Sequence, residues 1–210
     1  MLCRLTPSLV LCSPWRPYWP KPRERVLRLK AAGVFPPGHP STRLCLDLLK
    51  DTLVAEPRGP LLDVGCGSGV LMLAAAALGV RRCVGVDLSR QAARLSKDNA
   101  RQNLLGGAVQ VAQGSTECLK GTFPVILANL PWAVQLEKVL ELCRLAAPGG
   151  VLILSGFKDT QEEALKAGYE AQGWFFSRRL TQDEWVPDLP PEKSYTWVAW
   201  LLKRQDPGRS

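Results

Sequence analysis

Three glycines, Gly65, Gly67 and Gly69, follow a short apolar run and precede an apolar helical pattern. A glycine-rich turn between a strand and a helix lets the backbone approach a ligand closely, and free N–H groups at the helix start favour an anionic group. Asp87 stands 22 residues after Gly65, at the end of the next apolar run. A carboxylate at that position can accept hydrogen bonds from the hydroxyls of a ribose. These residues predict a site for a nucleoside-containing cofactor.

The spacing of the glycines narrows the choice of cofactor. It is G-x-G-x-G, whereas dinucleotide-binding loops have G-x-G-x-x-G. An aspartate stands two residues before the first glycine, as in D-x-G-x-G methyltransferase loops. We therefore predict S-adenosylmethionine as the cofactor, with a nicotinamide or flavin cofactor and a purely structural turn as the alternatives. In these two segments the residues predicted to bind it are Asp63, Gly65, Cys66, Gly67, Gly69, Asp87 and Leu88.

A polar residue also ends the apolar run 124–128, in the sequence Asn129-Leu130-Pro131-Trp132. Methyl transfer from a sulfonium needs no metal and little acid–base help, but the acceptor nitrogen must be aligned with the C–S bond. The Asn129 side chain and the Leu130 backbone carbonyl can accept hydrogen bonds from an amino group, and Trp132 can pack on the substrate. These three are the predicted catalytic residues. The alternative is a strand-to-loop turn with a buried tryptophan.

From about residue 60, short apolar runs alternate with longer amphipathic stretches, which is typical of βαβ units and a mostly parallel sheet. A strand at 25–29 and a helix at 41–54 precede them. The last two runs, 174–180 and 194–202, have no helical pattern between them and predict an antiparallel hairpin. The expected strands of the parallel part are 60–64, 82–86, 108–112, 124–128 and 151–154, and the expected helices are 70–78, 89–103, 134–145 and 160–172.

The net charge of +8 is unevenly distributed, because the first 43 residues hold eight basic residues and one acidic residue. This charge indicates either a contact with nucleic acid or a ribonucleoprotein, or a basic N-terminal segment that is exposed to solvent and has no partner. The seven cysteines are scattered and only one histidine is present, so we expect neither a disulfide framework nor a metal site. No signal peptide and no apolar run of roughly 18 residues is evident. We therefore expect a cytoplasmic protein that does not enter membranes.

Taken together, these residues resemble the PrmA family of ribosomal protein methyltransferases. Two segments are far more specific for this family than the glycine loop. They are Gly38-His39-Pro40-Ser41-Thr42-Arg43-Leu44-Cys45-Leu46 and Leu154-Ser155-Gly156. The resemblance covers nearly all of the chain from about residue 10. It implies a class I S-adenosylmethionine-dependent methyltransferase, a Rossmann-like α/β fold with a seven-stranded sheet. It also places Thr42, Gly65, Asp87 and Asn129 on the cofactor-contacting positions of the family.

The chain departs from that family in three places. PrmA proteins carry an N-terminal substrate-recognition domain, and this chain begins where that domain should end. Phe35-Pro36-Pro37-Gly38 replaces a glycine- and threonine-rich loop, and Asn129-Leu130-Pro131-Trp132 replaces Asn-Ile-Leu. The latter looks like the N-L-P-Y or N-P-P-Y of enzymes that methylate adenine amino groups or glutamine amides. We divide the chain into a basic Pro- and Trp-rich extension (1–38), a methyltransferase domain (39–204) and a disordered tail (205–210).

Three functions follow from this pattern. The favoured one is N-methylation of a lysine or α-amine in a ribosomal or other translation-linked protein. The second is N-methylation of an RNA or DNA base, which the sequence after residue 128 and the basic start support. The third is a cofactor-binding but inactive subunit that assembles with a catalytic or ribosomal partner. The sequence leaves open the acceptor, the number of methyl groups added and the oligomeric state.

Overall fold

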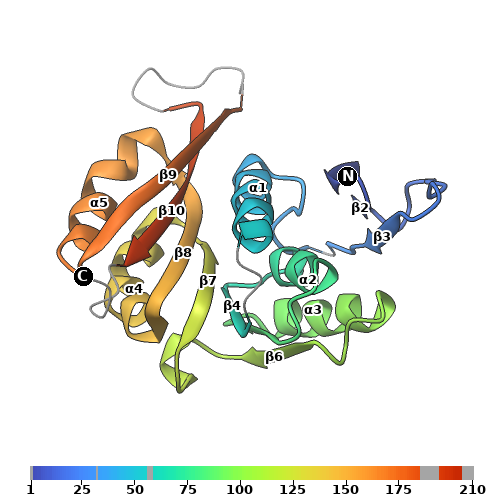
Figure 1. Ribbon diagram of the computed structural model, residues 1–210, viewed down its shortest axis with the longest axis horizontal. Helices are drawn as coiled ribbons and strands as arrows, with labels where there is room; N and C mark the ends of the chain where they lie inside the picture. Colours follow the sequence, from blue (N-terminus) through green and yellow to red (C-terminus); the bar gives the residue numbers. More distant parts are fainter. Residues whose placement is uncertain (1, 32, 56–58, 185–193, 205–210) are drawn as a thin grey trace.

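The computed structural model of the chain describes residues 2–31, 33–55, 59–184 and 194–204 (Figure 1). Its centre is a seven-stranded sheet in the order β6-β5-β4-β7-β8-β10-β9. β4 to β8 are parallel, and β10 is antiparallel to both β8 and β9. The predicted parallel sheet with a terminal hairpin is confirmed, while the predicted tail 205–210 lies outside the described residues. The strands are β4 (Leu61–Val64), β5 (Cys83–Asp87), β6 (Val109–Gln113), β7 (Phe123–Asn129), β8 (Ala146–Lys158), β9 (Trp174–Asp183) and β10 (Thr196–Arg204).

Helices cover both faces of this sheet, with α1, α2 and α3 on one side and α4 and α5 on the other (Figure 1). Leu61 belongs to the core beneath α1 and α2, and Leu62 to the core beneath α4 and α5. Because both faces are buried, the central strands are apolar at successive positions. Among the described residues no helix is long and apolar enough to cross a membrane. The helices are α1 (Pro40–Ala55), α2 (Val70–Ala77), α3 (Arg90–Gln102), α4 (Trp132–Leu145) and α5 (Glu162–Glu170).

Two element boundaries differ from the predicted ones near the site. β8 starts at Ala146 rather than at 151, because Ala146 still pairs with Phe123 and a register shift follows on β7. Gly149 has a φ of +66°, so the Pro-Gly-Gly segment bends within the strand rather than forming a separate loop. α4 begins at Trp132, directly after Pro131, two residues before the predicted start. The loop between β7 and α4 is correspondingly short.

Residues 2–31 contain a second, three-stranded sheet of β1 (Leu2–Thr6), β2 (Leu9–Cys12) and β3 (Arg25–Arg28). The strand predicted at 25–29 is confirmed as β3, but β1 and β2 were not predicted. Their leucines enter the core beneath α1 and α2. Asn103, directly after α3, holds β3 in place, because its side-chain amide accepts from Arg28 N at 2.8 Å and donates to Arg28 O at 2.9 Å. This segment is therefore a packed layer, where the sequence suggested a basic Pro- and Trp-rich extension with one strand.

β4 lies at the point where the chain reverses its direction of winding through the sheet. It pairs with β5 on one side and with β7 on the other. Ligands of parallel α/β sheets bind at the carboxyl ends of the strands at such a switch point. Gly65 follows β4 directly, Asp87 ends β5 and Asn129 ends β7. The fold thus brings the three predicted groups to one crevice, as the alternation of strands and helices indicated.

Candidate functional site

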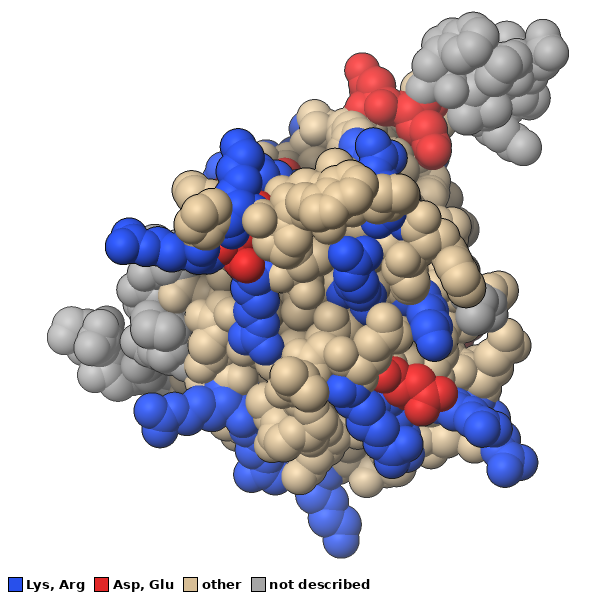
Figure 2. Space-filling view, turned by 90° about the vertical axis from the view of Figure 1, so that its right-hand side faces the viewer, with Lys and Arg blue, Asp and Glu red and all other residues tan. Residues whose placement is uncertain are grey.

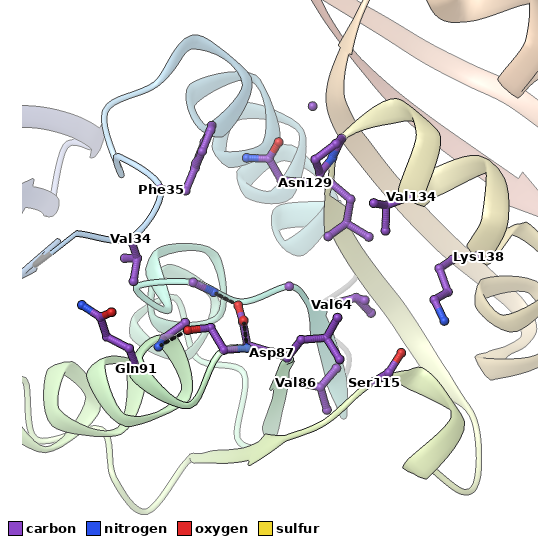
Figure 3. Close-up of a pocket in the computed structure, with 18 of the residues that line it drawn as sticks. Val34, Phe35, Val64, Val86, Asp87, Gln91, Ser115, Asn129, Val134 and Lys138 are labelled. Carbon is purple, nitrogen blue, oxygen red and sulfur yellow. Dashed lines mark hydrogen bonds between the residues drawn. The ribbon is translucent and has the colours of Figure 1, made fainter.

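A cavity of about 640 Å³ opens at this switch point (Figure 3). Gly65 and Gly67 line it from the loop after β4, and Asp87 and Leu88 line it from the end of β5. Asn129 lines it from the end of β7. Figure 3 shows Asp87 and Asn129 on different walls, with Phe35 beside Asn129. The cavity therefore has two parts, a wall of glycines and a carboxylate and a wall built around an amide.

The glycine loop is held close to the sheet by backbone hydrogen bonds. Val86 O accepts from Gly65 N at 2.8 Å and from Cys66 N at 3.0 Å. Gly65 has a φ of +67°, and a Cβ atom there would lie 2.4 Å from Leu130 Cδ2. The backbone conformation therefore favours glycine at this position, and any larger residue would also require the Leu130 side chain to move.

Asp87 is fixed by one backbone N–H on each carboxylate oxygen. Oδ2 accepts from Gly67 N at 2.9 Å, and Oδ1 accepts from Ser89 N at 2.8 Å. A carboxylate oxygen has two lone pairs, so each keeps the capacity to accept from a ligand. Because the two anchoring groups are backbone atoms, the side chain is oriented before any ligand arrives. Its position fits the predicted contact with ribose hydroxyls.

Other residues predicted to bind the cofactor lie behind the loop and do not line the cavity. Asp63 is buried, and its Oδ2 accepts from Met72 N at 3.2 Å, which joins β4 to α2. Cys66 packs against Ser96, with Sγ 3.5 Å from Oγ, and burial raises the pKa of its thiol. Gly69 has a φ of +80° at the start of α2. These three residues therefore support the glycine loop from behind and do not face the cavity.

The burial of Asp63 can be tested through its ionisation. Burial raises the pKa of its carboxyl from an ordinary value of 3.8 to about 7. The folded state thus retains a proton that the unfolded state loses, so the stability from this group is full below about pH 4 and disappears as the pH rises through 7. Replacing Asp63 with Asn keeps an oxygen for Met72 N and removes the ionisation. We expect D63N to be more stable than the natural chain by about 4 kcal/mol at pH 8 and by only about 1.5 kcal/mol at pH 5, because the ionisation penalty of Asp63 grows between these two pH values. Thermal unfolding at both pH values measures this difference.

The exposed Asp98→Asn is the matched control, because it removes one carboxylate from the surface of α3. It should leave the difference between the two pH values unchanged. A D63N protein whose advantage is the same at pH 5 and pH 8 would show that Asp63 does not titrate in this range.

Asn129 forms the centre of the second wall. Its Nδ2 donates to Thr42 Oγ1 at 3.2 Å, which joins the end of β7 to α1. Its Oδ1 is buried and has no hydrogen-bond partner among the described residues. A buried acceptor without a donor costs on the order of 1–3 kcal/mol, so this oxygen is suited to an N–H of a bound substrate. Thr42 itself is buried and does not line the cavity; its contact with the site is through Asn129.

The loop after Asn129 is seated tightly on β8. Leu130 N donates to Ser155 O at 3.0 Å, and Leu130 O accepts from Gln135 Nε2 at 3.2 Å. Leu130 and Pro131 line the cavity, whereas Trp132 lies at the first position of α4 and is not part of the lining. The predicted Leu130 carbonyl is thus already bonded within the protein. The predicted contact between Trp132 and a substrate stays a prediction.

Gly156 makes this seating possible, since it has a φ of +96° and a Cβ atom there would lie 2.2 Å from Leu130 O. We expect Gly156→Ala to displace the loop after Asn129 and to lower the free energy of unfolding by about 2 kcal/mol or more. The control is Gly121→Ala, with a φ of +87° and nothing within 4 Å of the added Cβ. Denaturant unfolding of both variants separates the backbone strain, which they share, from the collision. Equal destabilisation of the two would show that the approach of residue 156 to Leu130 does not matter.

The comparison with known proteins agrees with this arrangement. The profile of the family described as "Ribosomal protein L11 methyltransferase (PrmA)" matches residues 3–187. The chain belongs to the PrmA family. The resemblance that the sequence motifs indicated is therefore confirmed, and the match includes both the glycine loop and Asn129.

Two PrmA relatives show how much of the family this chain represents. The ribosomal protein L11 methyltransferase of Syntrophotalea carbinolica is 38% identical over 185 residues, which are 87% of this chain and 60% of that protein. The one from Pelobacter propionicus is 35% identical over 187 residues, with the same two coverages. The chain thus spans about 60% of the length of these curated relatives.

Solved structures support the PrmA fold. The ribosomal protein L11 methylase of Lactobacillus delbrueckii subsp. bulgaricus superposes with a TM-score of 0.78 at 20% identity, covering 97% of this chain and 98% of that one. The magnesium protoporphyrin IX methyltransferase of Synechocystis, solved with bound S-adenosylmethionine, gives a TM-score of 0.63 at 19% identity, with coverages of 78% and 79%. The expected class I methyltransferase fold is confirmed.

The PrmA motifs did not reveal an aromatic group beside Asn129. The ring centroids of Phe35 and His39 are 4.6 Å apart, and those of His39 and Trp197 are 4.5 Å apart. Phe35 and Trp197 line the cavity, and Lys158 Nζ lies 3.8 Å from the centre of the Trp197 ring. Burial lowers the pKa of His39. Phe35 precedes α1 and Trp197 lies on β10, so no spacing along the sequence could bring them together.

Proposed function

We propose that this chain is an S-adenosylmethionine-dependent N-methyltransferase that modifies a lysine or α-amine of a ribosomal or other translation-linked protein. The observation that carries the proposal is the buried, unpartnered Oδ1 of Asn129, a residue that lines the cavity. An amine N–H is a donor of the kind that this oxygen lacks. Cytoplasmic location is part of the same proposal, because ribosomal proteins are made and assembled there.

The cavity fits S-adenosylmethionine on two observations. The carboxylate of Asp87 is anchored through one lone pair of each oxygen and is free to accept from ribose hydroxyls through the others. The loop at Gly65 and Gly67 brings bare backbone to the cavity wall, where a Cβ at Gly65 would collide with Leu130. These residues would hold the cofactor, which supplies an activated methyl group on its sulfonium when it is bound.

The protein's own task is to place and neutralise the amine. Asn129 Oδ1 accepts one N–H and thereby directs the nitrogen lone pair, while Thr42 Oγ1 prevents the amide from turning. Phe35, Val134 and Trp197 give this wall an apolar lining. An apolar environment lowers the pKa of an amine because it disfavours the ammonium form. A lysine chain can extend between these side chains with its nitrogen at Asn129.

The names of the relatives support a protein acceptor, since both curated relatives are called ribosomal protein L11 methyltransferases. RNA base methylation is the second candidate, and the observation in its favour is Asn129-Leu130-Pro131-Trp132, whose first three residues line the cavity. In that case an aromatic ring of the motif would pack on the base. Trp132 lies outside the lining, so we favour the amine.

The test uses the purified chain, S-adenosylmethionine with a labelled methyl group, ribosomal protein L11 and a lysate of a strain that lacks the gene. We expect label in a protein band that a protease removes and a ribonuclease does not. Mass spectrometry of L11 then gives the modified nitrogen and the number of methyl groups. Label that only a nuclease removes would overturn the protein acceptor in favour of a base. An absence of label with cofactor bound would support an inactive subunit.

A further inference from the structure

Two tryptophans on the loop between β2 and β3 are almost fully exposed to solvent. The exposed fraction is 89% for Trp15 and 83% for Trp19, whereas Trp174 and Trp200 are 2% and 1% exposed. Indole rings are usually largely buried, because they bring more apolar surface than any other side chain. Neither exposed ring lines the cavity described above. The loop thus presents two flat aromatic faces to solvent, and neither is buried in the described core or part of the cavity lining.

The loop is held from within, so this exposure is built into its conformation. Glu24 accepts from Arg4 Nη1 at 2.5 Å, from Tyr18 Oη at 2.8 Å and from Lys21 N at 2.9 Å. The guanidinium of Arg28 donates to Arg16 O at 3.4 Å and to Tyr18 O at 3.3 Å. Polar side chains therefore form the interior of the loop, and the two tryptophans are left on its surface.

Positive charge surrounds the two rings. Exposed basic side chains on the loop and on β3 are Arg16, Lys21, Arg23 and Arg25. Glu24 is the one acidic residue in the first 46 positions, and its carboxylate is paired with Arg4. Figure 2, which looks at this side of the molecule, shows Lys and Arg side chains spread across the face among residues of other kinds, and acidic side chains in fewer places.

α3 adds a second row of charge next to β3. The amide of Asn103, just after the helix, accepts from Arg28 N of β3, and the amide of Asn99 accepts from Lys30 N, just after β3. The exposed basic residues of the helix lie at intervals of four, three and four, which is one face of a helix. They are Arg90, Arg94, Lys97 and Arg101.

We propose that the surface formed by the loop 13–24, β3 and α3 binds single-stranded RNA. Unpaired bases stack on Trp15 and Trp19, and the basic residues contact the phosphates. Stacking platforms in a positively charged surface are the shared feature of proteins that bind single strands. An acidic protein would match the charge but would leave both indole faces without a flat partner. The surface is separate from the cavity, so it does not depend on the acceptor of the methyl group.

The test measures the anisotropy of a fluorescent single-stranded RNA of mixed sequence during titration with the full chain. We expect Trp15→Ala and Trp19→Ala each to weaken binding about tenfold, within a range of roughly 5- to 150-fold per stacked base. Lys21→Ala with Arg23→Ala should reduce the slope of log K against log salt by about 0.7 for each phosphate that the protein no longer neutralises. Since both tryptophans are almost fully exposed, these variants should unfold at the temperature of the natural chain.

Matched controls lie on other surfaces. Phe175→Ala removes an exposed ring from β9, and Lys120→Ala with Lys203→Ala removes the same charge far from the loop. Both should bind RNA as the natural chain does. Three results would overturn the proposal: no binding at low salt, unchanged binding after removal of both tryptophans, or equal binding of duplex RNA. Equally effective competition by polyglutamate would assign the surface to an acidic protein instead.

Discussion

Replacing Asn129 with Ala is expected to reduce methyl transfer at least about 100-fold while changing the affinity for S-adenosylmethionine by less than about threefold. The substitution removes the buried Oδ1 that we assign to the acceptor amine. Removing one preorganised polar group that binds the reacting atoms typically costs 10²- to 10³-fold in turnover. Asp87 and the glycine loop, which we propose to hold the cofactor, are left unchanged. Single-turnover transfer and calorimetric titration of the cofactor measure the two effects separately.

Thr42 provides the matched controls for this experiment, because its Oγ1 accepts from the amide of Asn129. Thr42→Val keeps the shape and removes the acceptor, so the amide can turn; we expect transfer to fall roughly tenfold. Thr42→Ser keeps the hydroxyl and should keep most of the activity. Full transfer by Asn129→Ala would discard the proposed role of Oδ1, whatever the behaviour of the Thr42 variants.

Replacing Asp87 with Ala should have the opposite pattern, with cofactor affinity reduced about 100-fold. The carboxylate is expected to accept charged hydrogen bonds from the ribose, each of which contributes about 1.5–3 kcal/mol. Its removal also leaves Gly67 N and Ser89 N without their acceptor, so the glycine loop is no longer fixed at this point. At saturating S-adenosylmethionine, transfer should recover to within about tenfold of the natural rate.

The control for Asp87 is Asp98→Ala, which removes an exposed carboxylate from α3. It should bind the cofactor normally and show the same increase in melting temperature on addition of S-adenosylmethionine. The Asp87→Ala protein should show almost none of this increase, because ligand stabilisation falls with affinity. An undiminished increase would mean that Asp87 does not contact the cofactor.

The donor wall could be predicted from the sequence because its signals are local. The glycine loop, the end of β5 at Asp87 and the end of β7 at Asn129 each follow an apolar run directly. Parallel strands place such ends at one edge of a sheet, so the assembly of the three groups follows from the alternation of elements alone. Local signals do not distinguish the residues that line the cavity from those that support the glycine loop from behind. Asp63 and Cys66 have the right spacing but lie on the inner side of the loop.

The acceptor wall and the first sheet depend on contacts between distant parts of the chain. Phe35 and Trp197 are brought together by the pairing of β10 with β8 and by the position of α1, neither of which leaves a pattern around these residues. β1 and β2 are short, and prolines and tryptophans interrupt their surroundings. Their leucines become recognisable as core residues only when α1 and α2 are present to cover them.

The bond between Thr42 and Asn129 has a consequence for how such an enzyme can change during evolution. The residues that we propose to bind the donor lie within one stretch, 65–88, whereas those that we propose to surround the acceptor come from positions near 35–42, 129–134 and 197. Substitutions around the acceptor are expected to change which acceptor is bound without disturbing the binding of the methyl donor. New acceptors are therefore expected to arise through substitutions in loops and strand ends, with the donor-binding stretch unchanged.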